Sequence, residues 1–175
     1  VVAGAVAAGN SVTSGTGADL YDDIMSTNGT IAKVEADGFM VTGHVGAMTM
    51  RSRMRGLRDA NGVPLFNRTP QSPTPYELDG APVEFPLNGA VDATQALLIS
   101  GDYKQLVYSM RQDITYKMLS EAVIQDQSGN ILYNLAQQDM VALRAVIRLG
   151  WQLPNPINRL QTVEANRYPF SVLLP

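Results

Sequence analysis

Apolar side chains occupy every second position near the C-terminal end of the chain. The alternating residues are Val141, Leu143, Ala145, Ile147, Leu149, Trp151 and Leu153. Because the side chains of a strand point alternately to its two faces, this period of two predicts a long strand over 141–153 with one continuous apolar face. Arg144 and Arg148 fall on the opposite face. Pro154 ends the strand, since proline has no N–H to donate to a sheet.

A helical period occurs earlier in the chain. The apolar residues at helical spacing are Leu20, Ile24, Ile31 and Val34. We expect Thr16 to be the N-cap, with Asp22 and Asp23 in the positive first turns, and Gly38 to end the helix. Asn28-Gly29 interrupts the pattern, and a glycine inside a helix costs about 1 kcal/mol relative to alanine. The sequence therefore predicts a kink or a break there.

The remaining pattern predicts one more helix and several short strands. A strand is expected at 39–41, followed by a helix that ends near Gly56. Prolines make 61–75 an extended, non-helical excursion. Further strands are expected at 82–85, 96–100, 105–110 and 114–120. Asp126–Asn130 reads as a turn at the tip of a long hairpin. Helices and strands that do not alternate regularly indicate an α+β fold.

Composition narrows the class of protein. The chain has 175 residues, 45% of them hydrophobic, which suffices for one buried core or two small lobes. It has no cysteine, which excludes disulfides and zinc–thiolate sites and fits synthesis in a reducing cytoplasm. No apolar run reaches the length of a membrane span. The formal charge of -3 indicates a surface that is not built to condense nucleic acid.

The start of the chain is small and polar. Residues 1–15 are rich in Gly, Ala, Ser and Thr, and we expect them to form a connector with little core of its own. They lack the basic region of a signal peptide. The chain begins without Met, which predicts a fragment or a processed product.

Few residues are candidates for chemistry. His44 is the only histidine, but no neighbour in sequence supports a catalytic triad, so a structural or solvent-facing role is favoured over that of a general base. Asp59–Gly62 is similar to the start of a calcium loop, yet no later oxygen ligands and no closing Glu follow, and a turn is favoured. Asp126–Asn130 also lacks the later oxygen ligands and the closing Glu of a calcium loop. We predict no catalytic, cofactor-binding or metal-binding residues.

A basic cluster is the sharpest charge feature. It consists of Arg51, Arg53, Arg55 and Arg58. Contact with DNA phosphates is one interpretation, but no aromatic stacking platform lies nearby, and helix-dipole complementarity or ion pairs between copies are favoured. Met48, Met50 and Met54 are interpreted as adaptable packing. Trp151, on the apolar face of the long strand, is expected to pack in a core.

Several stretches together resemble Hong Kong 97-type tailed-phage major capsid proteins. The matching segments, in the order of that family, are Ala18–Ile24 with Val34–Val41, Leu57–Gly62 with Pro64–Phe66, Leu78–Val83, Ile99–Asp102 with Met110–Ile114, and Met140–Arg144. Each pattern is weak alone, and their common order is the stronger signal. The family has a crosslinking asparagine near Asn134, but Asn134 does not align with it without a shift, and we predict no crosslink.

The resemblance implies a fold, partners and a location. Residues 16–112 correspond to the axial domain and 113–175 to part of the peripheral domain, with no counterpart of the family's N-terminal arm, extended loop and spine helix. It implies a shell of pentamers and hexamers of this chain that encloses double-stranded DNA without sequence-specific binding. Scaffold, maturation protease and portal proteins are further implied partners, with no membrane. The protein would be made in the host cytoplasm and reside in the virion.

Two alternatives stay open at this point. A bacterial nanocompartment shell shares the fold but encloses cargo enzymes. A small α+β hydrolase using His44 is the other.

Overall fold

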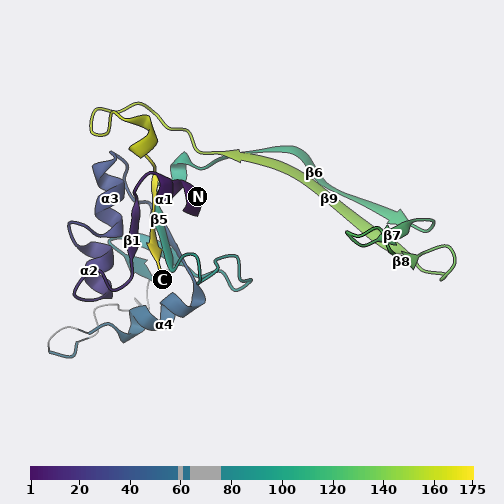
Figure 1. Ribbon diagram of the computed structural model, residues 1–175, viewed down its shortest axis with the longest axis horizontal. Coiled ribbons are helices and arrows are strands. Elements are labelled where there is room, and N and C mark those ends of the chain that lie inside the picture. The colour runs from purple at the N-terminus through teal and green to yellow at the C-terminus, as the bar shows by residue number, and fades with distance from the viewer. Residues whose placement is uncertain (59–60, 64–75) are drawn as a thin grey trace. The chain divides into compact units, whose positions relative to one another are not determined.

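The chain forms two compact units. The computed structural model describes residues 1–58, 61–63 and 76–175 (Figure 1), so most of the expected excursion at 61–75 lies outside the described residues. Val1–Leu106 and Leu153–Pro175 form one unit, here called the sheet unit. Val107–Gln152 forms the other, here called the ribbon unit.

The sheet unit is built on a mixed six-stranded sheet. Its strands, in spatial order, are β1 (Ser11–Thr13), β10 (Phe170–Leu174), β5 (Leu98–Gly101), β2 (Gly43–Gly46), β4 (Ala81–Glu84) and β3 (Glu77–Leu78). The β1–β10 and β2–β4 pairs are parallel and the others are antiparallel. The strand expected at 39–41 lies a few residues later, at β2, because the residues of β2 are the ones that pair with β5 and β4.

Helices cover both faces of this sheet. They are α1 (Val2–Ala7), α2 (Leu20–Met25), α3 (Thr30–Ala36) and α4 (Met48–Gly56), with short 3-10 turns at Tyr103–Gln105 and Glu164–Asn166. Leu173 packs in a core with Ile24 and Met54 from α2 and α4. Val172, its neighbour on β10, points to the other face and packs with Ala5 of α1. Because neighbouring side chains of β10 point to opposite faces of the sheet, α1 lies on one face and α2 and α4 lie on the other.

Local signals set the ends of α2 and α3. Asp19, not the expected Thr16, is the N-cap of α2, because its carboxylate accepts a hydrogen bond from the N–H of Asp22 at 3.0 Å. The expected break is present between the two helices at 26–29. A Cβ at Gly29 would lie 2.5 Å from the carbonyl oxygen of Ile24, so this tight approach needs glycine. Gly38, at φ +83°, follows the C-cap of α3 in the left-handed conformation.

The expectation that 1–15 is a connector was wrong. These residues form α1 and β1, Ala5 is fully buried, and β1 pairs with β10. The small side chains are what permit this packing, because a Cβ at Gly4 would lie 2.5 Å from the hydroxyl oxygen of Tyr168. The Ala- and Gly-rich composition reflects a close helix–sheet approach rather than a flexible segment.

The expected domain boundaries also differ from the two units. The division at 112/113 falls inside one strand, and 153–175 returns to the sheet unit. The physical reason is the pairing of β10, which lies between β1 and β5 with Phe170 to Leu173 buried. A pairing between segments so distant in sequence leaves no local signal.

The ribbon unit consists of two antiparallel strand pairs. They are β6 (Val107–Leu119) with β9 (Ala142–Gln152), and β7 (Val123–Gln125) with β8 (Ile131–Asn134). The strands expected at 105–110 and 114–120 are one strand, β6, whose register shifts between Met110 and Thr115 account for the expected interruption. The turn at Asp126–Asn130 joins β7 to β8, as expected.

Candidate interaction surface

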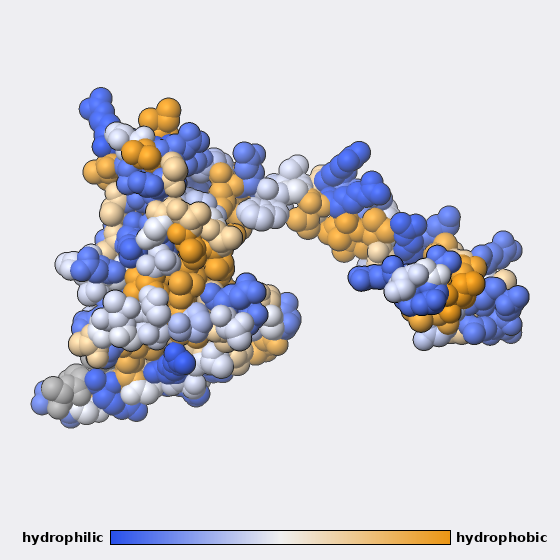
Figure 2. All heavy atoms as spheres, in the orientation of Figure 1, coloured by the Kyte–Doolittle hydropathy of each residue, from blue (hydrophilic) through white to orange (hydrophobic). Residues whose placement is uncertain are grey.

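One face of the β6–β9 ribbon is apolar. Because residues paired across an antiparallel ladder share a face, the register places Trp151 beside Tyr108, Leu149 beside Met110 and Leu143 beside Met118. This apolar face consists of Tyr108, Met110, Tyr116, Met118, Leu143, Ile147, Leu149 and Trp151. Figure 2 shows hydrophobic side chains gathered along one side of the ribbon and hydrophilic side chains along the other.

The apolar face is exposed in the single chain. Every member is at least 48% exposed, and Trp151 is 59% exposed, so the expectation that it packs in a core of its own chain was wrong. Large side chains offer roughly 150–250 Å² each, so eight of them exposed to this extent present roughly 700–1,200 Å². That area is larger than the largest apolar patch of a typical monomer, roughly 300–600 Å², and comparable to the roughly 800 Å² that each partner buries in a standard interface. The face is therefore an interaction surface.

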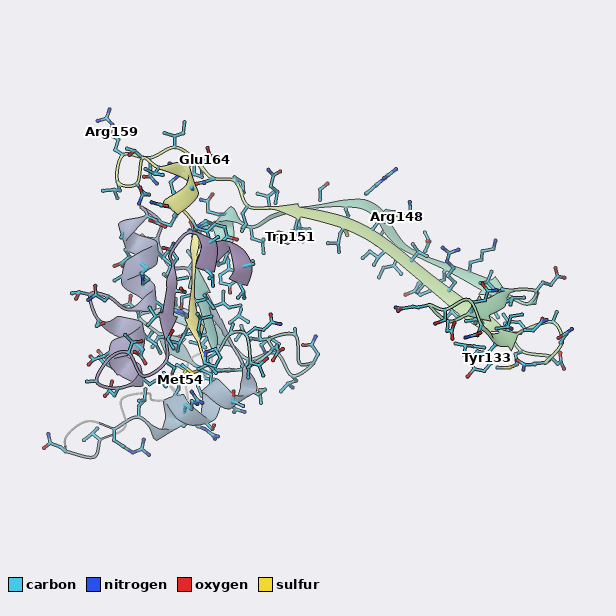
Figure 3. The ribbon with its side chains drawn as sticks, in the orientation of Figure 1. Met54, Tyr133, Arg148, Trp151, Arg159 and Glu164 are labelled. Carbon is cyan, nitrogen blue, oxygen red and sulfur yellow. The ribbon has the colours of Figure 1, made fainter. Side chains whose placement is uncertain are left out.

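The opposite face of the ribbon is polar and basic. Lys117 lies directly opposite Arg144, and Gln112 opposite Arg148. Figure 3 shows Arg148 and Trp151 leaving the ribbon on opposite sides, as their odd spacing requires. A hollow of about 180 Å³ is lined by Gln112, Thr115, Lys117, Arg144, Val146 and Arg148. These residues are called the basic face below.

A short hairpin forms the tip of the ribbon unit. The carboxylate of Asp126 accepts hydrogen bonds from the N–H groups of Ser128 and Asn130 at 2.8 and 2.9 Å, which closes the turn. The side-chain and backbone hydrogen bonds from Asn130 lower the pKa of Asp126 below its ordinary value, because they stabilise the ionised carboxylate. Leu135 is buried and anchors the tip, while Tyr133 on β8 is exposed.

His44 is a structural residue of the sheet. Its Nδ1 lies 2.8 Å from the Ser100 hydroxyl and its Nε2 3.2 Å from the carbonyl oxygen of Leu78. Since a carbonyl only accepts, Nε2 carries the proton and Ser100 donates to Nδ1. Burial lowers the pKa of His44 to about 4, against the opposing effects of the Leu78 hydrogen bond and the charge of Asp79. His44 and Ser100 are both buried, so this Ser–His pair cannot meet a substrate as the hydrolase alternative requires.

Two arginines of the basic cluster, Arg51 on α4 and Arg58 just after it, make contacts within the chain. Arg51 donates two hydrogen bonds to the Tyr76 hydroxyl, at 3.0 and 2.7 Å, and lies over its ring. Arg58 donates to the carbonyl oxygens of Arg55 and Leu57, where it caps the end of the helix. These contacts favour the expected role in helix-end stabilisation over contact with DNA.

The methionines of α4 divide between core and surface. Met50 and Met54 are fully buried in the main core of the sheet unit, as the packing interpretation expected, whereas Met48 is exposed. For Met50 and Met54 the packing interpretation is confirmed.

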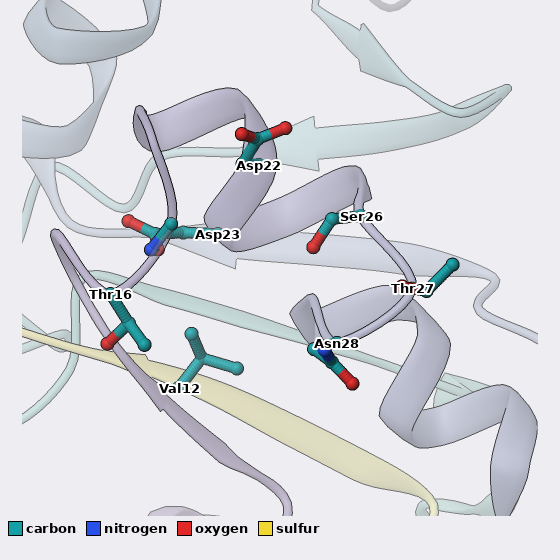
Figure 4. A pocket seen from close by; sticks show the side chains of 8 residues that line it. Val12, Thr16, Asp22, Asp23, Ser26, Thr27 and Asn28 are labelled. Atoms are coloured by element: carbon teal, nitrogen blue, oxygen red, sulfur yellow. The ribbon is translucent and has the colours of Figure 1, made fainter.

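A hollow lies beside α2 and the loop that precedes it. It measures about 280 Å³ and is lined by Val12, Thr16, Gly17, Asp22, Asp23, Ser26, Thr27 and Asn28 (Figure 4). The buried carboxylate of Asp23 accepts hydrogen bonds from the N–H groups of Gly15 and Gly17, both at 2.7 Å. Asp23 therefore holds the loop before α2 in place.

The described residues contain neither a cluster of potential metal ligands nor a candidate membrane span. No group of three or more potential metal-ligating side chains comes together in the described ranges. None of the helices there has the length and hydrophobicity needed to cross a bilayer.

Comparison with known proteins assigns the chain to a family. The sequence model of the Phage capsid family matches residues 1–161. The chain belongs to the phage capsid family. The resemblance to phage major capsid proteins, found in the order of the short motifs, is thereby confirmed. No curated protein matches the sequence.

Solved structures of phages share this fold. A chain of Microbacterium phage Oxtober96 is 35% identical, with a TM-score of 0.77 over 99% of this chain and 54% of that one. A chain of Mycobacterium phage Bobi is 30% identical, with a TM-score of 0.74 over 99% of this chain and 53% of that one. The expected α+β capsid fold is confirmed. The chain spans about half the length of these relatives.

Proposed function

We propose that this chain is a structural, non-catalytic subunit of a tailed-phage or prophage capsid. It associates with copies of itself into pentamers and hexamers that close into an icosahedral shell around double-stranded DNA. The observation that carries the proposal is the exposed apolar face of the ribbon in a chain of the phage capsid family. A two-stranded ribbon cannot cover both its own faces, so this face becomes buried only against another segment or another copy.

Shell assembly does not require any one contact to be strong. Heterologous contacts between identical subunits propagate until they close, and many weak contacts act together through effective concentration. Exposed edges and loops supply such contacts because their backbone and side-chain groups are not all paired within the chain. The likeness to solved phage structures favours a virion shell over a nanocompartment. Scaffold, maturation protease and portal proteins complete the proposed set of partners, and synthesis takes place in the host cytoplasm.

The test is electron microscopy of the complete reading frame, expressed together with its flanking genes. We expect uniform closed shells that contain DNA after infection or induction. Protein that stays a small species under these conditions contradicts the proposal, and shells filled with a cargo enzyme favour the nanocompartment.

A matched pair of variants tests the surface itself. Leu149→Asp places a charge on the apolar face, while Leu160→Asp makes the same change at an exposed leucine of the sheet unit. Both chains should fold, because neither leucine is buried, as far-UV circular dichroism would check. We expect Leu149→Asp to abolish shells and Leu160→Asp to leave them intact. Normal shells from Leu149→Asp would show that the apolar face is not an assembly contact.

A further inference from the structure

The basic face holds an unfavourable arrangement of charges. Lys117 lies directly opposite Arg144, and like charges in that position of a ladder repel each other. Arg148 follows on the same face of β9. No carboxylate of the described residues forms an ion pair with any of these three side chains. The single chain therefore presents three uncompensated cations around one hollow.

The complementary charge lies in the same unit. The ribbon unit contains the cations Arg111, Lys117, Arg144 and Arg148 and the anions Asp113, Glu121, Asp126 and Asp139. Three of the carboxylates, Glu121, Asp126 and Asp139, belong to the segment between β6 and β9; they are called the acidic tip below. Glu121 and Asp139 are exposed, and Asp126 is partly exposed. The unit is neutral as a whole, with Asp113 on β6 and the other three carboxylates beyond the β6–β9 strand pair.

We propose that the basic face receives the acidic tip of a second copy of this chain. The inference rests on the proposed self-association and specifies one of its contacts. Such a contact is heterologous, so each copy offers a face to one neighbour and a tip to another, and the contact propagates around a ring or shell. The charges select the partner and fix its register, while the apolar face supplies most of the buried area.

The charges favour a protein partner over DNA at this face. A phosphate backbone is attracted by an excess of positive charge over an extended surface. The ribbon unit has equal numbers of cations and anions and the whole chain carries -3, so that excess is missing. A hollow of about 180 Å³ accommodates a few carboxylate side chains.

Reciprocal charge reversal in the complete protein tests the contact. One variant is Arg144→Glu with Arg148→Glu, which makes the basic face acidic. The other is Glu121→Lys with Asp139→Lys, which makes the tip basic. The control is Arg159→Glu, one arginine-to-glutamate change at an exposed position of the sheet unit (Figure 3). Light scattering measures the protein concentration at which shells form, and microscopy confirms their size.

The proposal predicts that each variant alone needs at least a tenfold higher concentration to assemble. Combining all four changes in one chain should restore assembly, because each acidic face then meets a basic tip. Assembly of both single variants at the wild-type concentration would overturn the tip contact while leaving the shell function intact. Normal shells that package less DNA would assign the basic face to DNA instead. Failure of the wild-type protein to form shells would overturn the proposed function.

Discussion

Acidification should weaken the sheet unit through one buried side chain. His44 lies on the central strand β2 with only 1% of its surface exposed, and burial lowers its pKa from 6.5 to about 4. Above pH 6.5 the ring is neutral in the folded and the unfolded chain, so it contributes no pH dependence. As the pH falls below 6.5, the unfolded chain binds the proton first and stability is lost progressively until about pH 4.

The magnitude follows from the gap between the two pKa values. A tenfold difference in proton affinity is worth about 1.4 kcal/mol, so the gap corresponds to a loss of about 3 kcal/mol in the free energy of unfolding. That is a large fraction of the 5–15 kcal/mol typical of a domain. Urea unfolding at pH 7.5, 5.5 and 4.5, followed by far-UV circular dichroism, measures it, because α1, α2, α3 and α4 all belong to the sheet unit.

The variant His44→Gln separates this effect from the titration of carboxylates. Glutamine keeps an amide that can hydrogen-bond but does not titrate in this range. We expect the variant to be less stable at pH 7.5 by about 1–3 kcal/mol, the cost of disturbing a buried hydrogen-bonded group. Between pH 7.5 and 4.5 it should lose about 2.5 kcal/mol less than the wild type, because this window ends just above the folded pKa of about 4. Equal losses in the two proteins would refute the reasoning.

Two further substitutions test packing and charge. Gly101→Ala should lower the free energy of unfolding by about 1–3 kcal/mol through overpacking, because a Cβ there would meet the Phe170 ring and lie 2.5 Å from the Pro169 carbonyl oxygen. Gly150→Ala, with open space around its Cβ, is the control, and thermal unfolding compares the two. Lys117→Glu should stabilise the isolated ribbon by about 0.2–1 kcal/mol, since it converts a like-charge pair with Arg144 into an attractive one. Hydrogen exchange of the β6 and β9 amides measures this, and faster exchange at low salt would contradict it.

Local patterns in the sequence were sufficient for the elements whose signals are local. The alternation over 141–153 predicted β9 to within one residue at each end, and Gly56 was correctly expected to end α4. The helix break at Asn28-Gly29 and the turn at Asp126–Asn130 were also confirmed. In each case the cause lies in the period of a few side chains or in the backbone freedom of a glycine, which neighbouring residues determine by themselves.

Pairing between distant segments required the tertiary structure. The strands β1 and β10 become recognisable only once they lie side by side, and their pairing moved the first and last segments of the chain into the sheet unit. His44 could be read as a base or as a structural group until Ser100 and the Leu78 carbonyl were placed around its ring.

The apolar face of the ribbon also depends partly on local pattern and partly on the pairing of distant segments. The sequence determined that one face of the long strand is apolar, because a period of two assigns alternate side chains to the same face. It did not determine what covers that face, and Trp151 was therefore expected in a core. Only the structure showed β6 as the partner of β9, with the apolar side chains of both strands exposed together and Lys117 opposite Arg144. Periodicity is a property of neighbouring residues, whereas burial and charge pairing depend on which distant segments the fold brings into contact.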